Sequence, residues 1–307
     1  MFFRPTPSSS KTWETKGLGD RAYERVGITL NLPRITIVTP SYNQGRYLEQ
    51  TILSVLSQRY PNLEYLVMDG GSTDNSVEII RRYADRLAYW QSKPDGGQAS
   101  AIAKGFEMAS GTILGWLNSD DLLLPGCLLT VANMFPQDGK TVALAGRCII
   151  IGSSGEPLKV NLPIQRTWAK MLFYGHGLPQ MATFWTRNAY ELAGGLDISL
   201  RFCFDADLFV KLRRIGKIAV STDYLSAFRL HPNSKTSTMQ DIHQMEMQLI
   251  RERFGKGSFP GISRMFRRIR FSHRVKDTLA WRIDKTRIVR IMVSTRTMSS
   301  SGQAQNC

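Results

Sequence analysis

The sequence predicts an α/β protein with a mostly parallel, Rossmann-like sheet flanked by helices. From Pro33 onward, short β-rich runs alternate with stretches of helical periodicity, which is the pattern of parallel β-α-β units. The 307 residues include 42% hydrophobic and 10% aromatic side chains, which is enough to bury a large core. We therefore expect one main α/β domain with additions at its ends.

The first β-α unit begins with a strand at 35–39, whose sequence Ile-Thr-Ile-Val-Thr is rich in β-branched residues. The stretch 47–58 follows as a helix, because Leu48, Ile52 and Val55 repeat at the spacing of one helical face. This strand and helix set the pattern for the units that follow.

The later units repeat the alternation. The strand 63–68 precedes a helix for which Asp74 is the expected N-cap. The strand 87–91 leads through two glycines to a helix at 99–108, and 113–117 forms a fourth strand. Beyond this region the chain becomes rich in loops and shows no internal repeat.

Polar residues follow three of these strands at the point where each ends. They are Ser41-Tyr42-Asn43, the run from Asp69 to Asp74, and Asn118-Ser119-Asp120-Asp121. Because the carboxyl ends of parallel strands share one edge of the sheet, we expect a single site built from separate loops. Its carboxylates suit a divalent metal that carries a phosphorylated ligand.

The adjacent carboxylates Asp120 and Asp121 stand between two apolar runs, where repulsion and desolvation both cost free energy. A cationic partner is expected beside them, and Mg²⁺ or Mn²⁺ would meet that need. The alternative interpretation is that the pair satisfies the free N–H groups and the dipole of a following helix.

Both ends of the chain depart from the α/β pattern. Residues 1–32 are mixed in composition, with a Pro-Ser stretch, and are interpreted as an N-terminal extension. The net charge of the chain is +15, and residues 251–307 hold fourteen Lys and Arg against three acidic residues. From 271 to 283 an apolar residue recurs at every fourth position among these arginines, as on one face of a helix. Such a helix suits an anionic membrane surface, and a helix packed on the main domain is the alternative.

The cysteines and the apolar stretches suggest a location. The four cysteines form no C-x-x-C pair, so neither a zinc site nor a disulfide framework is indicated. The first residues lack the apolar core of a signal peptide, and the apolar stretches are too short to span a bilayer. We expect a cytoplasmic protein, peripheral on the inner face of the cell membrane if the basic tail binds it.

Four blocks together resemble the family 2 glycosyltransferases, which are inverting enzymes of the GT-A fold. The blocks are "TIVTPSYNQGRYLEQTILSVLSQRYPNLEYLVMDGGSTDNS", "KPDGGQASAIAKGFEMASGTILGWLNSDDLLLPG", "GGLDISLRFCFDADLFVKL" and "FRLHPNSKTS". They occur in the family's order over roughly 33–237. The resemblance implies a GT-A domain at 33–237 and leaves 238–307 as a helical, basic C-terminal region.

The resemblance also assigns residues to the site. It implies that Asp120 and Asp121 bind the metal, Asp120 being the second carboxylate of the family's D-x-D motif. In this chain Asn118 replaces the first carboxylate of that motif. The donor-binding residues it implies are Pro40, Tyr42, Asp69, Gln98, Asn118 and His231.

The catalytic base implied by the resemblance is Asp205, with Asp207 at a second acidic position. A general base is needed because the acceptor hydroxyl must lose its proton as it attacks the anomeric carbon. The predicted function is therefore metal-dependent, hexosyltransferase-like transfer from a nucleotide diphosphate sugar to a saccharide or lipid-linked saccharide, in bacterial cell-surface polysaccharide biosynthesis.

Two other classes of protein are alternatives to a transferase. A nucleic-acid-binding protein would explain the charge and predicts strongly salt-dependent binding, but the 33–237 region carries little of the excess charge. We expect no nucleic-acid partner. A nucleotidyltransferase or an inactive nucleotide-sugar-binding module of the same fold is the second alternative. A nucleotidyltransferase would need a Gly-rich loop after the first strand, which the stretch from Ser41 to Gly45 does not resemble.

Overall fold

The computed structural model describes residues 32–136 and 138–255, and in this part of the chain the strands form one nine-stranded sheet. The strand order is β3-β2-β1-β4-β8-β6-β9-β5, with β7 paired to β6. The strands are β1 Ile35–Ser41, β2 Leu63–Asp69, β3 Tyr89–Ser92, β4 Ile113–Trp116, β5 Leu122–Leu123, β6 Thr141–Ile151, β7 Pro157–Asn161, β8 Thr183–Thr186 and β9 Lys217–Arg229. The α-helices are α2 Gly45–Leu56, α3 Ser76–Arg82, α4 Gln98–Met108, α5 Cys127–Met134, α6 Trp168–Tyr174, α7 Arg187–Leu192, α8 Phe204–Ile215, α9 Lys235–Thr238 and α10 Gln240–Gly255, and the 3₁₀ helices are η1 Ala84–Arg86 and η2 Gln180–Ala182.

The first four strands form the predicted parallel half of the sheet. β1 pairs in parallel with both β2 and β4, and β2 pairs in parallel with β3. All seven residues of β1 are buried, as expected for a central parallel strand that is covered on both faces. The carboxyl ends of these strands therefore lie at one edge of the sheet.

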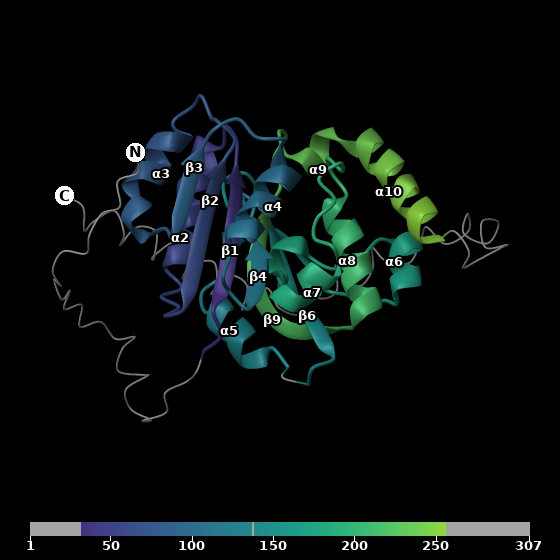
Figure 1. The fold of residues 1–307 in the computed structure, drawn as a ribbon. Coiled ribbons are helices and arrows are strands. Elements are labelled where there is room, and N and C mark those ends of the chain that lie inside the picture. Colours follow the sequence, from purple (N-terminus) through teal and green to yellow (C-terminus); the bar gives the residue numbers. More distant parts are fainter. Residues whose placement is uncertain (1–31, 137, 256–307) are drawn as a thin grey trace, which may run out of the picture. The chain divides into compact units, whose positions relative to one another are not determined.

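Helices cover both faces of this half. α2 and α3 lie on one side of β1–β3, and α4 lies on the other (Figure 1). Right-handed crossovers require this arrangement, because the connection through α4 runs back across the sheet from β3 to β4. Gly105 lets α4 approach closely, since a Cβ atom there would lie 2.6 Å from Val38 Cγ1.

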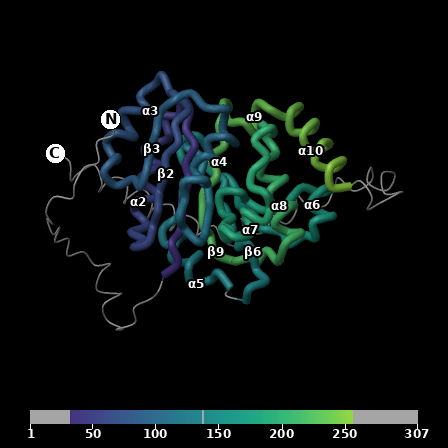
Figure 2. The backbone as a smooth tube through the Cα atoms, in the orientation of Figure 1, coloured from purple at the N-terminus to yellow at the C-terminus, as the bar shows by residue number. Residues whose placement is uncertain are grey.

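The second half of the sheet brings distant segments together. β6 and β9 pair in parallel over most of their length and run side by side (Figure 2). The short strand β5 pairs antiparallel with β9, with Leu122 opposite Ala227. Each residue before Leu122 is therefore brought toward a residue after Ala227, which places the Asp120–Asp121 pair beside the end of β9.

The region around α8 packs into the same core as α4. Buried residues of α4, α8 and β8 share one hydrophobic cluster, to which Met247 and Ile250 of α10 also belong. The α10 helix, residues 240–255, thus packs onto the main domain. The end of the predicted glycosyltransferase domain at 237 stays a prediction. The predicted stripe at 271–283 lies outside the described residues.

The observed elements differ from the predicted ones mainly at their ends. Asn75 is the N-cap of α3, and the Asp74 carboxylate instead accepts hydrogen bonds from the N–H groups of Ser76 and Gly45, both at 2.9 Å. Asp74 therefore ties the start of α2 to the start of α3. Within 32–136 and 138–255, no helix has the length and apolar character needed to cross a membrane.

Candidate active site

A cavity of about 920 Å³ opens at the carboxyl edge of the parallel strands. Its walls come from the loops after β1, β2 and β4, the start of α4, and the segment around the start of α8. Among the residues that line it are Pro40, Tyr42, Gln98, Asn118, Asp120, His176, Gln180 and Asp205. Three other predicted site residues are buried behind this wall. The exposed fraction is 0% for Asp69, 0% for Asp121 and 7% for His231.

The loop after β1 forms one end of the cavity. Tyr42 is 61% exposed there, while Ser41 beside it is buried. The loop is fixed by Asn43, which adopts a positive φ of 51° and whose side-chain oxygen accepts a hydrogen bond from Thr73 N at 2.8 Å. Residues from two strand ends thus form one rigid wall.

Asp69 organises the loop after β2. Its Oδ2 accepts hydrogen bonds from the N–H groups of Gly71 and Ser72 and from Ser92 Oγ, and its Oδ1 accepts one from Ser72 Oγ. These contacts hold Gly70 and Gly71 in the cavity wall. The contact of Asp69 with a nucleobase stays a prediction.

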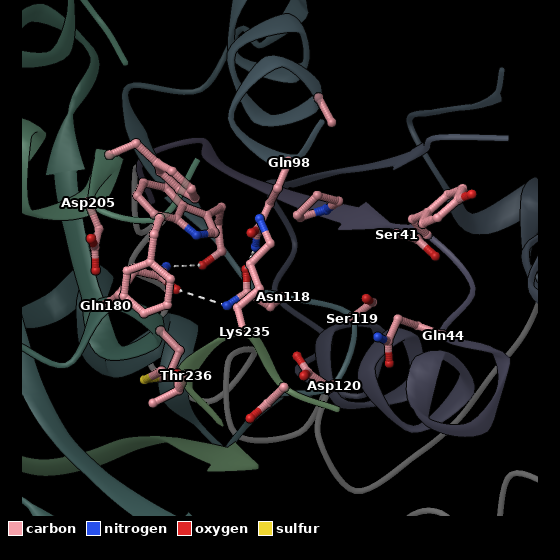
Figure 3. A pocket seen from close by; sticks show the side chains of 18 of the residues that line it. Ser41, Gln44, Gln98, Asn118, Ser119, Asp120, Gln180, Asp205, Lys235 and Thr236 are labelled. Atoms are coloured by element: carbon pink, nitrogen blue, oxygen red, sulfur yellow. Dashed lines mark hydrogen bonds between the residues drawn. The ribbon is translucent and has the colours of Figure 1, made fainter. Parts of the chain in front are cut away.

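A chain of amide side chains crosses the middle of the cavity (Figure 3). Gln98 Nε2 donates to Asn118 Oδ1 at 2.7 Å, and Asn118 Nδ2 is 3.2 Å from Asp121 Oδ2 and 3.3 Å from Gln180 Oε1. Gln180 Nε2 donates in turn to the carbonyl of Trp116 at 2.8 Å. Asn118 is therefore a hub that links α4, the Asp pair and η2.

Asp120 and His231 form a close pair. Asp120 Oδ2 lies 3.0 Å from His231 Nε2, and their side chains are 17% and 5% exposed. The His231 ring packs against Tyr47 with centroids 5.0 Å apart. The antiparallel pairing of β5 with β9 explains why these two residues meet.

Asp121 is held by the protein itself. Its Oδ1 accepts a hydrogen bond from Arg229 N at 2.9 Å, and burial together with the charge of Asp120 raises the pKa of Asp121 well above its ordinary value. The Arg229 guanidinium is buried and donates to the carbonyl of Asp120 at 2.9 Å and to Gln50 Oε1 at 2.9 Å. Arg229 thus fixes the backbone of this loop. The role of Asp121 as a metal ligand stays a prediction.

Asp205 stands at the other end of the cavity from Ser41, with Asn118 between them in the view of Figure 3. It occupies the first turn of α8, where Ala206 N donates to its Oδ1 at 2.7 Å. Its Oδ2 lies 3.5 Å from His176 Nε2. The second acidic residue, Asp207, faces away in ion pairs with Lys211 at 2.6 Å and Arg253 at 3.0 Å, so it anchors α8 to α10.

Sequence reasoning missed Gln180 and His176 as site residues. Both lie in the loop-rich region after Ile151, where no periodicity shows which side chains face the sheet edge. A Pro-Gln pair and a Gly-His-Gly run were the available signals. Neither predicts a contact unless the path of the loop is known.

In the described part of the chain, no group of three or more His, Cys, Asp and Glu side chains could hold a metal ion alone. Asp120 in the cavity wall and His231 directly behind it form a smaller set of two such side chains. Mg²⁺ and Mn²⁺ sites in transfer enzymes commonly use one or two protein ligands and complete their shell with substrate phosphates and water.

The mostly parallel sheet and the cavity at its carboxyl edge are those of a glycosyltransferase of the GT-A fold. The chain belongs to glycosyl transferase family 2, whose family model matches residues 36–187. This confirms the family resemblance and the predicted fold class.

Relatives identified by sequence similarity agree with that assignment. An uncharacterized glycosyltransferase of Haemophilus influenzae is 30% identical over 63% of this chain and 84% of its own length. Chondroitin synthase of Pasteurella multocida is 28% identical over 61% of this chain and 19% of its own length.

Two structural neighbours share the fold. They are TarS 1-349 of S. aureus in complex with UDP-GlcNAc (TM-score 0.54, 16% identity, 74% of this chain and 68% of that chain) and a mannosyltransferase of Pyrobaculum calidifontis in complex with GDP-Man and Mn²⁺ (TM-score 0.55, 19% identity, 72% of this chain and 65% of that chain). At these identities the likeness shows the fold alone.

Proposed function

We propose that this protein transfers a sugar from a nucleotide diphosphate sugar to an acceptor hydroxyl, with inversion at the anomeric carbon. One observation carries the proposal. Asp205 and Asp120 both line the cavity but belong to different elements, Asp205 to the start of α8 and Asp120 to the segment after β4, where it contacts the buried His231 that follows β9. One group can therefore serve the acceptor while the other serves the leaving diphosphate.

The donor would lie with its nucleoside against Pro40 and Tyr42 and its diphosphate toward Asp120. The Ser41 hydroxyl is buried at this end of the cavity and has no hydrogen-bond partner among the described residues, so it is available to a polar atom of the nucleoside. Gln98 and Asn118 would contact the donor from the middle of the cavity. The nucleotide sugars bound by the structural neighbours support this donor class.

Asp120 and His231 would hold Mg²⁺ or Mn²⁺. Their 3.0 Å separation fits this role, because neighbouring ligands of an octahedral ion with bonds of about 2.1 Å are about 3.0 Å apart. A bound divalent cation would neutralise the charge that develops on the leaving diphosphate. Asp121 would position Asn118 and the loop through its buried hydrogen bonds.

Asp205 would act as the general base. A single displacement with inversion requires a proton acceptor near the attacking hydroxyl, on the side of the sugar away from the diphosphate. In that step the acceptor oxygen bonds to the anomeric carbon, the bond from that carbon to the diphosphate oxygen breaks, and the acceptor proton moves to Asp205.

We propose bacterial cell-surface polysaccharide biosynthesis as the setting, with a saccharide or lipid-linked saccharide as acceptor. The similarity to a Pasteurella polysaccharide synthase supports this setting. Peripheral attachment to an anionic membrane is proposed for the basic tail. Deleting residues 260–307 should then lower activity on lipid-linked acceptors and leave activity on soluble acceptors unchanged.

The first experiment is calorimetric titration of UDP, GDP, dTDP and CDP with and without Mn²⁺. The wild type should bind one of them in a metal-dependent manner, and Asp120→Ala should lose the metal dependence. Asp85→Ala, in η1, is the matched control and should bind as the wild type does. A folded wild type that binds none of the four, or binds them equally without metal, would contradict the proposal.

A further inference from the structure

His176 lies in the cavity wall beside the residue that we propose as the base. Its Nε2 is 3.5 Å from Asp205 Oδ2, and the two side chains are 24% and 25% exposed. This separation is longer than a formed hydrogen bond. Catalytic hydrogen bonds are often long in the absence of substrate and tighten in the reactive complex.

The other ring nitrogen determines which tautomer His176 adopts. Leu178 N donates a hydrogen bond to His176 Nδ1 at 3.2 Å. A ring nitrogen that accepts a hydrogen bond carries no proton, so the proton of the neutral imidazole is on Nε2. The donor of His176 therefore faces Asp205.

The loop that carries His176 is held on several sides. Gly175 and Gly177, which flank His176, have φ angles of 77° and 72°, a conformation that glycine adopts without strain. Arg166 donates to the carbonyls of Tyr174 and Gly175. The imidazole packs against the ring of Phe209 in α8, with centroids 5.2 Å apart. The ring orientation is thus determined before any substrate binds.

Burial, more than any neighbouring charge, keeps the His176 ring neutral. Burial lowers the pKa of His176 below its ordinary value, and Arg166 and His243 of α10 lower it further, which outweighs the opposite effect of Asp205. At neutral pH the ring is therefore a hydrogen-bond donor without a charge. A neutral donor orients a carboxylate and reduces its basicity less than a cation would.

We propose that His176 is a positioning residue for Asp205, donating its Nε2–H to Oδ2 so that the carboxylate keeps one orientation toward the acceptor hydroxyl. The inference rests on the proposed role of Asp205 as base. With Ala206 N on Oδ1 and His176 on Oδ2, each oxygen keeps a free lone pair for the proton that it receives. His176 itself takes up no proton in the reaction.

Two amide substitutions separate this role from packing. His176→Asn keeps a polar atom near the position of Nδ1 but is too short to reach Asp205, whereas His176→Gln places an N–H group near the position of Nε2. The assay is Mn²⁺-dependent release of nucleoside diphosphate from UDP-GlcNAc and from GDP-mannose, with water as the acceptor. Donor affinity is measured on the same samples by calorimetry.

We expect His176→Asn to lower kcat by about tenfold or more without changing the affinity for nucleotide, and His176→Gln to recover most of the loss. Equal kcat losses in both variants, or a wild-type kcat in His176→Asn, would overturn the inference.

A readout independent of turnover is the ¹⁵N spectrum of the histidine rings. We expect the Nε2–H tautomer for His176 in the wild type and a changed Nε2 shift in Asp205→Asn. A proton on Nδ1 would overturn the inference even if neither donor is hydrolysed. If Asp205→Asn keeps wild-type transfer, the proposed base is wrong. If Asp205→Asn is inactive and His176→Asn keeps wild-type activity, Asp205 remains the proposed base and the positioning role of His176 is wrong.

Discussion

Asp120 and His231 are 111 residues apart in the sequence, yet Asp120 Oδ2 and His231 Nε2 are 3.0 Å apart in the fold. The two-residue strand β5 produces this contact by pairing with the end of β9. The pair places the Asp120 carboxylate in the cavity wall, with the His231 imidazole behind it, where we propose that the diphosphate leaves.

Replacing His231 with Ala should remove one of the two proposed metal ligands. We expect Mn²⁺ to enhance nucleotide binding at least tenfold less in the variant, because losing even an outer-shell partner of a metal ligand commonly weakens a metal site by about tenfold or more. Calorimetric titration with and without Mn²⁺ measures the effect. His243→Ala on α10 serves as the control, and an unchanged metal response in His231→Ala would exclude this ligand.

Replacing Asp205 with Asn should abolish the general base and keep its shape. We expect kcat to fall by about 10² or more while the dissociation constant for nucleotide stays the same. Asp207→Asn provides the contrast, since Asp207 is buried in ion pairs with Lys211 and Arg253. That variant should lose thermal stability instead, and a catalytic loss confined to Asp207→Asn would reverse the two roles.

Glu246 on α10 should be required for the geometry of the base. Its carboxylate accepts hydrogen bonds from the N–H groups of residues 201, 202 and 203 at 2.6, 2.9 and 2.7 Å, just before α8 begins. Glu246→Gln keeps one acceptor oxygen only, so we expect a loss of about 1–3 kcal/mol in unfolding free energy and a lower kcat. Urea unfolding and steady-state rates measure both, with the exposed Glu252→Gln as control.

Glu64 should make stability depend on pH. Burial alone would raise its pKa, but hydrogen bonds from Ser110 and Thr36 and the charge of Arg34 outweigh burial and lower the pKa below its ordinary value of 4.5. The ionised form is thus favoured in the folded state, so its contribution is present above pH 4.5 and is lost as pH falls through the lowered pKa.

Glu64→Gln should therefore cost about 1–3 kcal/mol of unfolding free energy at pH 7 and less below pH 4. Urea denaturation at the two pH values measures the difference. Glu107→Gln, an exposed residue of α4, should change stability by less than about 0.5 kcal/mol at either pH. A cost for Glu64→Gln that is the same at both pH values would show that ionisation of Glu64 does not contribute.

Local sequence patterns were enough to predict the parallel half of the fold and the loops that could meet at its edge. Ile35–Ser41 and Leu63–Asp69 are short apolar runs followed by helical periods, and such local patterns identify strands of a parallel sheet. Because parallel strands share one carboxyl edge, the loops with Tyr42, Asp69 and Asp120 could be assigned to one site before their contacts were known.

Which of those side chains line the cavity and which support it depends on contacts between distant segments. Asp69, Asp121 and Arg229 have the residue types of binding groups, yet their hydrogen bonds are made within the protein. The juxtapositions of Asp120 with His231 and of His176 with Asp205 depend on the register of β5 on β9 and on the path of an irregular loop. Neither juxtaposition produces a periodic pattern in the local sequence, because both arise from contacts between segments far apart in the chain.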